Sequence, residues 1–162
     1  MSPDTLRGRA AIVGVGLTPQ GKLPGSTNLS LQTDAFTLAL ADAGLGKSDI
    51  DGLLSEPGTT DMHWALDYLR LGRALGINPL YTGSFAMGGA TAAALVQLAA
   101  MAVTSGMATY VACCFGDAAK TGKRRPFLRD GAAGVLRAVR ARSERTLPSR
   151  SPETRDRCIA AS

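Results

Sequence analysis

The stretch SFAMGGATAAALVQLAAMAVTSGMATYVACC, residues 84–114, constrains the fold of this chain more than any other part of its sequence. A Gly-Gly pair precedes a long run of small and apolar residues, which ends at Ser105-Gly106 and leads into a second apolar segment. This order predicts a helix over 89–105 followed by a strand over 109–115. Because that helix is apolar on all sides, we expect other layers to cover both of its faces.

The residues before this stretch repeat the same alternation of strand and helix. Strands are predicted at 10–16, 50–54 and 80–86, and helices at 31–43 and 62–76. The run AAIVGVG at 10–16 is continuously apolar, so we expect both of its faces to be buried. Ser30 is the predicted N-cap of the first helix. Strands that alternate with helices indicate a largely parallel sheet with helices on both faces, so the predicted fold class is α/β.

Charge divides the chain into two parts. Residues 1–119 contain six Lys and Arg against nine Asp and Glu, a net charge of −3, whereas residues 120–162 contain 12 against four, a net charge of +8. The second part is rich in Arg, Ala, Ser and Pro, and we expect it to be an irregular basic tail. Such a tail could bind phosphates of a nucleic acid, but its single aromatic residue, Phe127, makes that the weaker interpretation.

The three cysteines, Cys113, Cys114 and Cys158, form no CxxC pair and have no histidine at ligand spacing, so we expect no metal site. Cys113 and Cys114 lie in a predicted strand and are expected to be buried thiols rather than nucleophiles. An odd number of cysteines without a secretory signal favours a reduced, cytoplasmic chain.

No charged residue occurs between Arg73 and Asp117, and a stretch of this length could cross a bilayer. However, Pro79 and several glycines interrupt it, and Thr91 and Gln97 lie within its helical part. These residues favour a buried helix of a globular domain, and we expect no membrane span.

Two motifs that carry chemistry in other proteins are weak here. The glycines of Gly14-Val15-Gly16 lack the third glycine and the immediate helix of a dinucleotide-binding site, because Leu17-Thr18-Pro19 follow them. His63, the only histidine, has no identifiable Cys, Ser or carboxylate partner beside it. We therefore interpret His63 as a solvated residue of the first helical turn rather than as a general base.

The helix start at Gly88-Gly89 is the strongest candidate site. A helix N-terminus carries unpaired N–H groups and the positive end of the helix dipole, which stabilise an anion or a developing oxyanion. In an α/β sheet it also lies at the carboxyl ends of the strands, where ligands bind. The two glycines would let a substrate approach the backbone closely. An equally good interpretation is that they let two helices or two subunits pack tightly.

The segments GRAAIVGVGLTPQGK, SLQTDAFTLALADAGLGKSDIDGLL, LGINP and GGATAAALVQLAAMAVTSGMATYVACCFGD make residues 9–117 resemble the N-terminal half of a thiolase-superfamily protein. The resemblance implies the N-terminal βαβαβαβ half of a five-layered αβαβα fold. It also implies a homodimer, formed through the strand before Gly88 and the following helix. Residues 1–119 would be this partial domain, whereas residues 120–162 depart from the family pattern and suggest a frameshifted or truncated reading frame.

An active thiolase opens this helix with a nucleophilic cysteine in a Cys-x-Ser-Gly context. Counting back from the stop at Ser105-Gly106 places that motif on residues 89–92, so Gly89 occupies the position of the nucleophile. The resemblance therefore implies no catalytic residue in this chain. It leaves Gly88, Gly89 and Thr91 as candidate substrate-binding residues.

Superfamily members that lack the cysteine include the lipid-transfer-type, or sterol-carrier-type, proteins. We therefore expect a thiolase-like protein, related to acetyl-CoA acetyltransferases, that acts on or binds acyl-CoA thioesters in lipid or steroid metabolism and holds no cofactor. Whether the chain is itself an enzyme stays open, because the nucleophile and the second half are missing. The alternatives are a non-catalytic lipid or acyl-CoA carrier and a retro-aldolase subunit that needs an OB-fold partner, since retro-aldol cleavage requires no acyl-cysteine.

Overall fold

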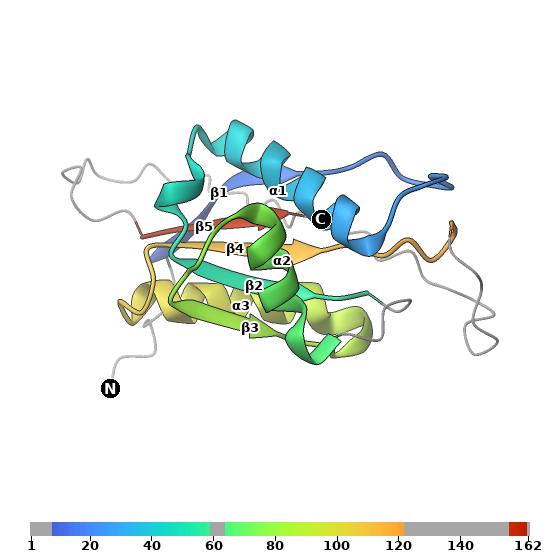
Figure 1. Cartoon of the computed structure of the whole chain (residues 1–162). Helices are drawn as coiled ribbons and strands as arrows, with labels where there is room; N and C mark the ends of the chain where they lie inside the picture. Colours follow the sequence, from blue (N-terminus) through green and yellow to red (C-terminus); the bar gives the residue numbers. More distant parts are fainter. Residues whose placement is uncertain (1–7, 59–63, 122–155, 162) are drawn as a thin grey trace.

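The computed structural model describes residues 8–58, 64–121 and 156–161. These residues form an α/β fold around one five-stranded sheet in the order β1-β5-β4-β2-β3, and every neighbouring pair of strands is parallel (Figure 1). The strands are β1 (Ala10–Gly16), β2 (Gly52–Glu56), β3 (Tyr81–Ser84), β4 (Tyr110–Phe115) and β5 (Asp156–Ala161). The helices are α1 (Asn28–Ala43), α2 (Asp67–Leu75) and α3 (Thr91–Thr104), with short 3-10 turns η1 (Lys47–Asp49), η2 (Trp64–Leu66) and η3 (Gly88–Ala90). The predicted α/β class and the predicted order of strands and helices up to β4 are confirmed.

The helices cover the sheet on both faces. Helices α1 and α2 lie on one face and α3 lies on the other (Figure 1). Because side chains alternate along a strand, Leu53 of β2 joins the core under α1 and α2, whereas the next residue, Leu54, joins the core under α3. Two separate apolar cores therefore fix the position of β2 in the middle of the domain.

A half-buried carboxylate holds the amino ends of β2 and β4 together. Asp51, the residue before β2, accepts hydrogen bonds of 2.8 Å from the backbone N–H groups of Thr109 and Tyr110. Tyr110 is the first residue of β4, and Thr109 comes directly before it. The aspartate thus sets the register in which Gly52 pairs with Val111.

The structure corrects the expectation that both faces of β1 are buried. Within the described part of the chain, strand β1 lies at the edge of the sheet and pairs with β5 alone. Its Ile12 and Val15 side chains are 45% and 43% exposed. Only α1 covers the strand closely, because Gly14 and Gly16 leave no room for a Cβ atom against the helix backbone. A continuous apolar run therefore does not by itself identify a central strand.

The N-cap of α1 is also different from the prediction. Thr27, not Ser30, occupies the N-cap position, and its side chain accepts a hydrogen bond of 3.0 Å from the Ser30 N–H. The Ser30 hydroxyl in turn accepts a hydrogen bond of 2.9 Å from the Thr27 N–H. This reciprocal capping box needs Ser30 at the third helical position, so the helix begins three residues earlier than its sequence pattern indicates.

The sequence led us to expect that both faces of helix α3 are covered. In the structure, one face packs on the sheet and the other is partly exposed. Its Leu95, Ala99 and Val103 pack on the sheet, whereas Met101 on the outer side is 46% exposed. No helix among the described residues is long and apolar enough to cross a membrane.

The last strand was not predicted. Residues 156–161 form β5 inside the segment expected to be an irregular tail, and β5 lies between β1 and β4. Parallel pairing on both sides places every residue of this short segment in a backbone ladder with a neighbour. Such pairing arises from the neighbouring strands, and no local sequence pattern reports it. Of the rest of the predicted tail, only Lys120 and Thr121 are among the described residues.

Candidate functional site

The candidate site lies at the carboxyl ends of the parallel strands, where α3 begins. The 3-10 turn of Gly88–Ala90 leads into α3, and Gly88 adopts a left-handed conformation with φ of 64°. Gly88 and Gly89 are exposed, and a Cβ atom built on either would have no heavy atom within 4 Å among the described residues. The backbone at this turn is therefore open to a ligand.

Thr91 closes the same turn with its side chain. Its hydroxyl accepts a hydrogen bond of 2.7 Å from the Met87 N–H and donates one of 2.8 Å to the Gly88 carbonyl. Thr91 is fully buried, so its hydroxyl serves the turn and the residues beneath it rather than bulk solvent. Of the three predicted substrate-binding residues, Gly88 and Gly89 expose their backbone and Thr91 shapes it.

Glu56, the last residue of β2, lies next to this turn and was missed by the sequence analysis. It follows Leu54 at a spacing of two, so its side chain is on the face covered by α3. Burial raises the pKa of Glu56, a side-chain hydrogen bond with Thr91 lowers it, and the negative charge of Asp117 raises it. The signal that could have revealed it is a single charged residue at the end of the apolar run GLLSE.

The backbone of Glu56 is held from the opposite face by α1. The Gln32 side chain is fully buried, and its Nε2 donates hydrogen bonds of 2.8 Å to the Glu56 carbonyl and 2.9 Å to Asp67 Oδ2. Asp67 also forms a salt bridge of 2.7 Å with Arg70. The carbonyl of Glu56 is therefore tied to a buried polar network, while its carboxyl group faces α3.

A second amide of α1 joins the loops that follow β2 and β4. Asn28 Nδ2 donates a hydrogen bond of 2.7 Å to the Pro57 carbonyl, and Asn28 Oδ1 accepts one of 2.7 Å from the Ala118 N–H. Asp117 lies in the second of these loops. The first turns of α1 thus position both acidic residues of the candidate site from beneath.

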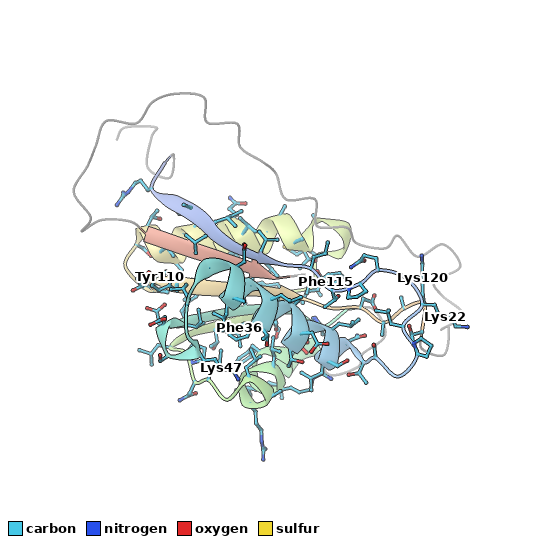
Figure 2. All side chains as sticks on the ribbon, turned by 90° about the horizontal axis from the view of Figure 1, so that it is seen from above. Lys22, Phe36, Lys47, Tyr110, Phe115 and Lys120 are labelled. Atoms are coloured by element: carbon cyan, nitrogen blue, oxygen red, sulfur yellow. The ribbon has the colours of Figure 1, made fainter. Side chains whose placement is uncertain are left out.

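Two lysines lie near the same end of the sheet. Figure 2 shows Lys22 and Lys120 beyond Phe115, which ends β4, while Tyr110 marks the opposite end of that strand. The two lysine-bearing loops are joined by a hydrogen bond of 2.9 Å from the Leu23 N–H to the Thr121 hydroxyl. The edge that carries the candidate site therefore presents both signs of charge.

A cavity of about 360 Å³ opens beside the end of β3, lined by Ala65, Ser84, Phe85 and Ala86. The Ser84 hydroxyl lies 3.0 Å from the Ser55 hydroxyl and accepts a hydrogen bond of 2.9 Å from the Tyr68 N–H. These bonds attach the edge strand to α2 and leave an apolar lining on the cavity side.

The two cysteines of β4, Cys113 and Cys114, do not supply a nucleophile. Cys113 and Cys114 are buried, which confirms the prediction. Burial, with a smaller contribution from the charge of Asp67, raises the pKa of Cys114 to about 12, so its thiol stays protonated at neutral pH. His63 lies outside the described residues. Among the described residues, no group of three or more His, Cys, Asp or Glu side chains could hold a metal ion.

The chain is similar in sequence to a pregnene carboxyl-CoA lyase and to a steroid side-chain-cleaving aldolase. It is 43% identical over 107 residues to a 17-hydroxy-3-oxo-4-pregnene-20-carboxyl-CoA lyase of Mycobacterium tuberculosis, a match that covers 65% of this chain and 26% of the lyase. It is 39% identical over 111 residues to a steroid side-chain-cleaving aldolase of Thermomonospora curvata, covering 68% of this chain and 27% of that protein. The chain thus spans about a quarter of the length of these relatives.

A solved structure is also similar to this chain. The structure of an Ltp2-ChsH2(DUF35) aldolase superposes on this chain with a TM-score of 0.61 and 36% sequence identity, covering 72% of this chain and 29% of that one. No protein-family model matches the chain.

Proposed function

We propose that this chain is the N-terminal portion of a thiolase-like retro-aldolase that cleaves the side chain of a steroid CoA thioester. The observation that carries the proposal is the identity of 43% and 39% to a steroid CoA lyase and a side-chain-cleaving aldolase. These relatives favour the retro-aldolase alternative over an acetyltransferase-like activity. The finer thiolase-like assignment rests on the sequence resemblance described above.

Retro-aldol chemistry explains why a glycine is acceptable at position 89. In a 17-hydroxy-20-carboxyl-CoA steroid, the hydroxyl is on the carbon next to the one that bears the thioester. Loss of the hydroxyl proton breaks the bond between these two carbons, which yields a ketone and a thioester enolate. A proton then adds to the enolate carbon and gives a shortened acyl-CoA. No acyl group is transferred to the protein, so the reaction needs no cysteine at Gly89.

The residues of this chain supply an oxyanion site in this scheme. The exposed backbone of Gly88 and Gly89, at the positive end of the α3 dipole, would face the thioester oxygen, where negative charge develops in the enolate. Their lack of side chains leaves the approach open. The group that removes the hydroxyl proton would come from outside the described residues.

Two partners follow from the same proposal. The solved relative is a complex named for Ltp2 and ChsH2(DUF35), and we propose that this chain likewise needs a second subunit, of the OB-fold type. We also propose a homodimer through β3 and α3. In the sheet formed by the described residues, β3 is an edge strand, so its outer backbone groups could pair with a second strand.

The proposal is tested with a chimera in which residues 8–119 of this chain replace the aligned segment of the M. tuberculosis lyase. We expect the chimera to convert the 17-hydroxy CoA ester to a ketone and a shortened acyl-CoA, and to show no thiolysis of a 3-ketoacyl-CoA when free CoA is added. A folded chimera that binds the ester but leaves it uncleaved would support the acyl-CoA carrier instead. Thiolysis would contradict the assignment of Gly89.

A further inference from the structure

We propose that Glu56 is the proton-transfer residue that this chain contributes to the site, and that Gln32 is its positioning residue. The inference rests on the proposed retro-aldolase function and goes beyond it, because it assigns a proton donor to the N-terminal portion itself. Its evidence is the place of Glu56 at the end of β2, the buried groups that hold it, and its proximity to the open Gly88-Gly89 turn.

The backbone places Glu56 at the carboxyl ends of the strands, where the Gly88-Gly89 turn also lies. Glu56 ends β2, and Ser55, the residue before it, pairs with Ser84 on one side and Cys114 on the other. Its side chain is on the α3 face, where it contacts Thr91, the first residue of that helix. A ligand whose thioester oxygen meets the Gly88 and Gly89 backbone would therefore have its neighbouring carbon close to Glu56.

The surroundings of Glu56 favour its neutral form. Partial burial is the largest influence on the pKa of Glu56 and raises it. The hydrogen bond with Thr91 lowers the pKa, and the like charge of Asp117, in the loop after β4, raises it further, so the net direction is upward. The ion pair of Asp67 and Arg70 lies on the other face of the sheet, under α1 and α2, where it binds Gln32. Because its pKa is raised on balance, this carboxyl group can hold a proton closer to neutral pH than an exposed glutamate.

Thr91 links the protonation state of Glu56 to the glycine turn. A hydroxyl has one proton to donate, and the Thr91 hydroxyl donates it either to the Gly88 carbonyl, at 2.8 Å, or to the Glu56 carboxylate. The charged form of Glu56 competes for this proton, whereas the neutral form leaves it on the Gly88 carbonyl. The geometry of the turn therefore responds to whether Glu56 carries a proton.

Gln32 fixes the backbone from which Glu56 projects. Both protons of its side-chain amide are used, one on the Glu56 carbonyl and one on Asp67. Because Gln32 is fully buried, this arrangement cannot be replaced by water without a rearrangement of α1. These hydrogen bonds fix the backbone orientation at the end of β2, and with it the direction in which the Glu56 side chain projects.

The proposed step is balanced in protons. The neutral Glu56 carboxyl donates its proton to the enolate carbon of the thioester. Its O–H bond breaks, a C–H bond of the shortened acyl-CoA forms, and a carboxylate remains. That carboxylate takes a proton from water before the next turnover, and the proton lost earlier from the substrate hydroxyl passes to solvent.

Carboxyl NMR of the full chain tests whether Glu56 faces the ligand. The chain is labelled with ¹³C-glutamate, and the Glu56 signal is identified as the one that disappears in Glu56→Gln. This signal and the amide signals of Gly88 and Gly89 are then followed while acetyl-CoA is added. Free CoA is the control. We expect the amides and the carboxyl to respond to acetyl-CoA but not to free CoA. Amide shifts without a carboxyl response would overturn the role of Glu56 and leave the proposed function intact. If neither responds, binding at this site, and with it the proposed function, is contradicted.

The chimera tests the proton transfer itself. In the active chimera, Glu56→Gln should lower the rate of cleavage by on the order of 10²-fold, and Glu56→Asp should recover part of it. Gln32→Leu should shift the pH profile of cleavage, because the carboxyl group is displaced, whereas a residue with a merely structural role would change the amount of folded protein only. An unchanged rate in Glu56→Gln would refute the proposal.

Discussion

The side-chain amide of Gln32, on α1, donates a hydrogen bond of 2.8 Å to the backbone carbonyl of Glu56 at the end of β2. The two residues are 24 positions apart in sequence, and the bond fixes the end of a strand from a helix on one face of the sheet. The candidate site, on the other face, therefore depends on a buried residue that no ligand would touch.

Replacing Gln32 with leucine should destabilise the chain. The substitution leaves the Glu56 carbonyl and the buried Asp67 carboxylate without their amide donor, which costs about 1–3 kcal/mol of unfolding free energy. The matched control is Gln97→Leu, because Gln97 is exposed on α3. That control should change stability by less than about 0.5 kcal/mol. Urea unfolding measures both, and equal effects would show that the buried amide contributes nothing.

Two glycine-to-alanine substitutions should have opposite outcomes. A Cβ atom at Gly16 would lie 1.9 Å from the Ala35 carbonyl oxygen, so α1 must move away from β1. We expect Gly16→Ala to cost about 1–3 kcal/mol or more. At Gly89 the space is open and φ is not left-handed, so Gly89→Ala should leave thermal stability nearly unchanged. A stable Gly16→Ala protein would contradict the close packing of α1 on β1.

A cysteine at position 89 should be reactive, unlike the cysteines of β4. The pKa of Cys114 is raised to about 12 by burial, so that thiol should not react with iodoacetamide in the folded chain at pH 7. In Gly89→Cys, the new thiol is exposed at the start of α3 and should be alkylated rapidly, because a helix N-terminus favours the thiolate. Both proteins carry Cys158→Ser, which removes the third thiol. A Gly89→Cys thiol that reacts no faster than a free cysteine would contradict the placement of this residue at an anion-stabilising turn.

Glu56 should make stability depend on pH in a predictable direction. Burial raises the pKa of Glu56 in the folded chain above its ordinary value of 4.5, so the folded state binds more protons than the unfolded state between 4.5 and the raised value. Stability therefore falls as pH rises through this window. Glu56→Gln removes this effect and should be more stable than the unmodified chain at pH 8, with the difference vanishing below pH 4. Thermal melting of both proteins between pH 4 and pH 8 tests this prediction. A Glu56→Gln protein that is less stable than the unmodified chain at pH 8 would contradict it.

Much of the fold was predictable because strand and helix alternate with clear periods. The order of elements through β4 and the burial of Cys113 and Cys114 follow from local patterns of apolar residues. The position of β1 at the sheet edge does not, because exposure of Ile12 depends on which strands lie beside it. Strand β5 was missed for a similar reason, since its pairing with β1 and β4 is a contact between distant parts of the chain.

The candidate site was predictable only in its backbone. The helix start at Gly88-Gly89 is visible as a Gly-Gly pair before a long helix. Glu56 and Gln32 were not identified, because their relationship is made across the sheet and neither belongs to a motif. The first is a lone acid after an apolar run, and the second is a polar residue on a helix, which is ordinarily read as solvated.

The central claim is that this chain forms part of a site that cleaves a carbon–carbon bond by proton transfer, with no acyl-enzyme. The most direct measurement is mass spectrometry of the products made by the lyase chimera from the 17-hydroxy CoA ester in D₂O. We predict a ketone together with a shortened acyl-CoA that carries one deuterium on the carbon next to the thioester. An acyl group attached to the protein, or release of free CoA from the ester, would contradict the claim.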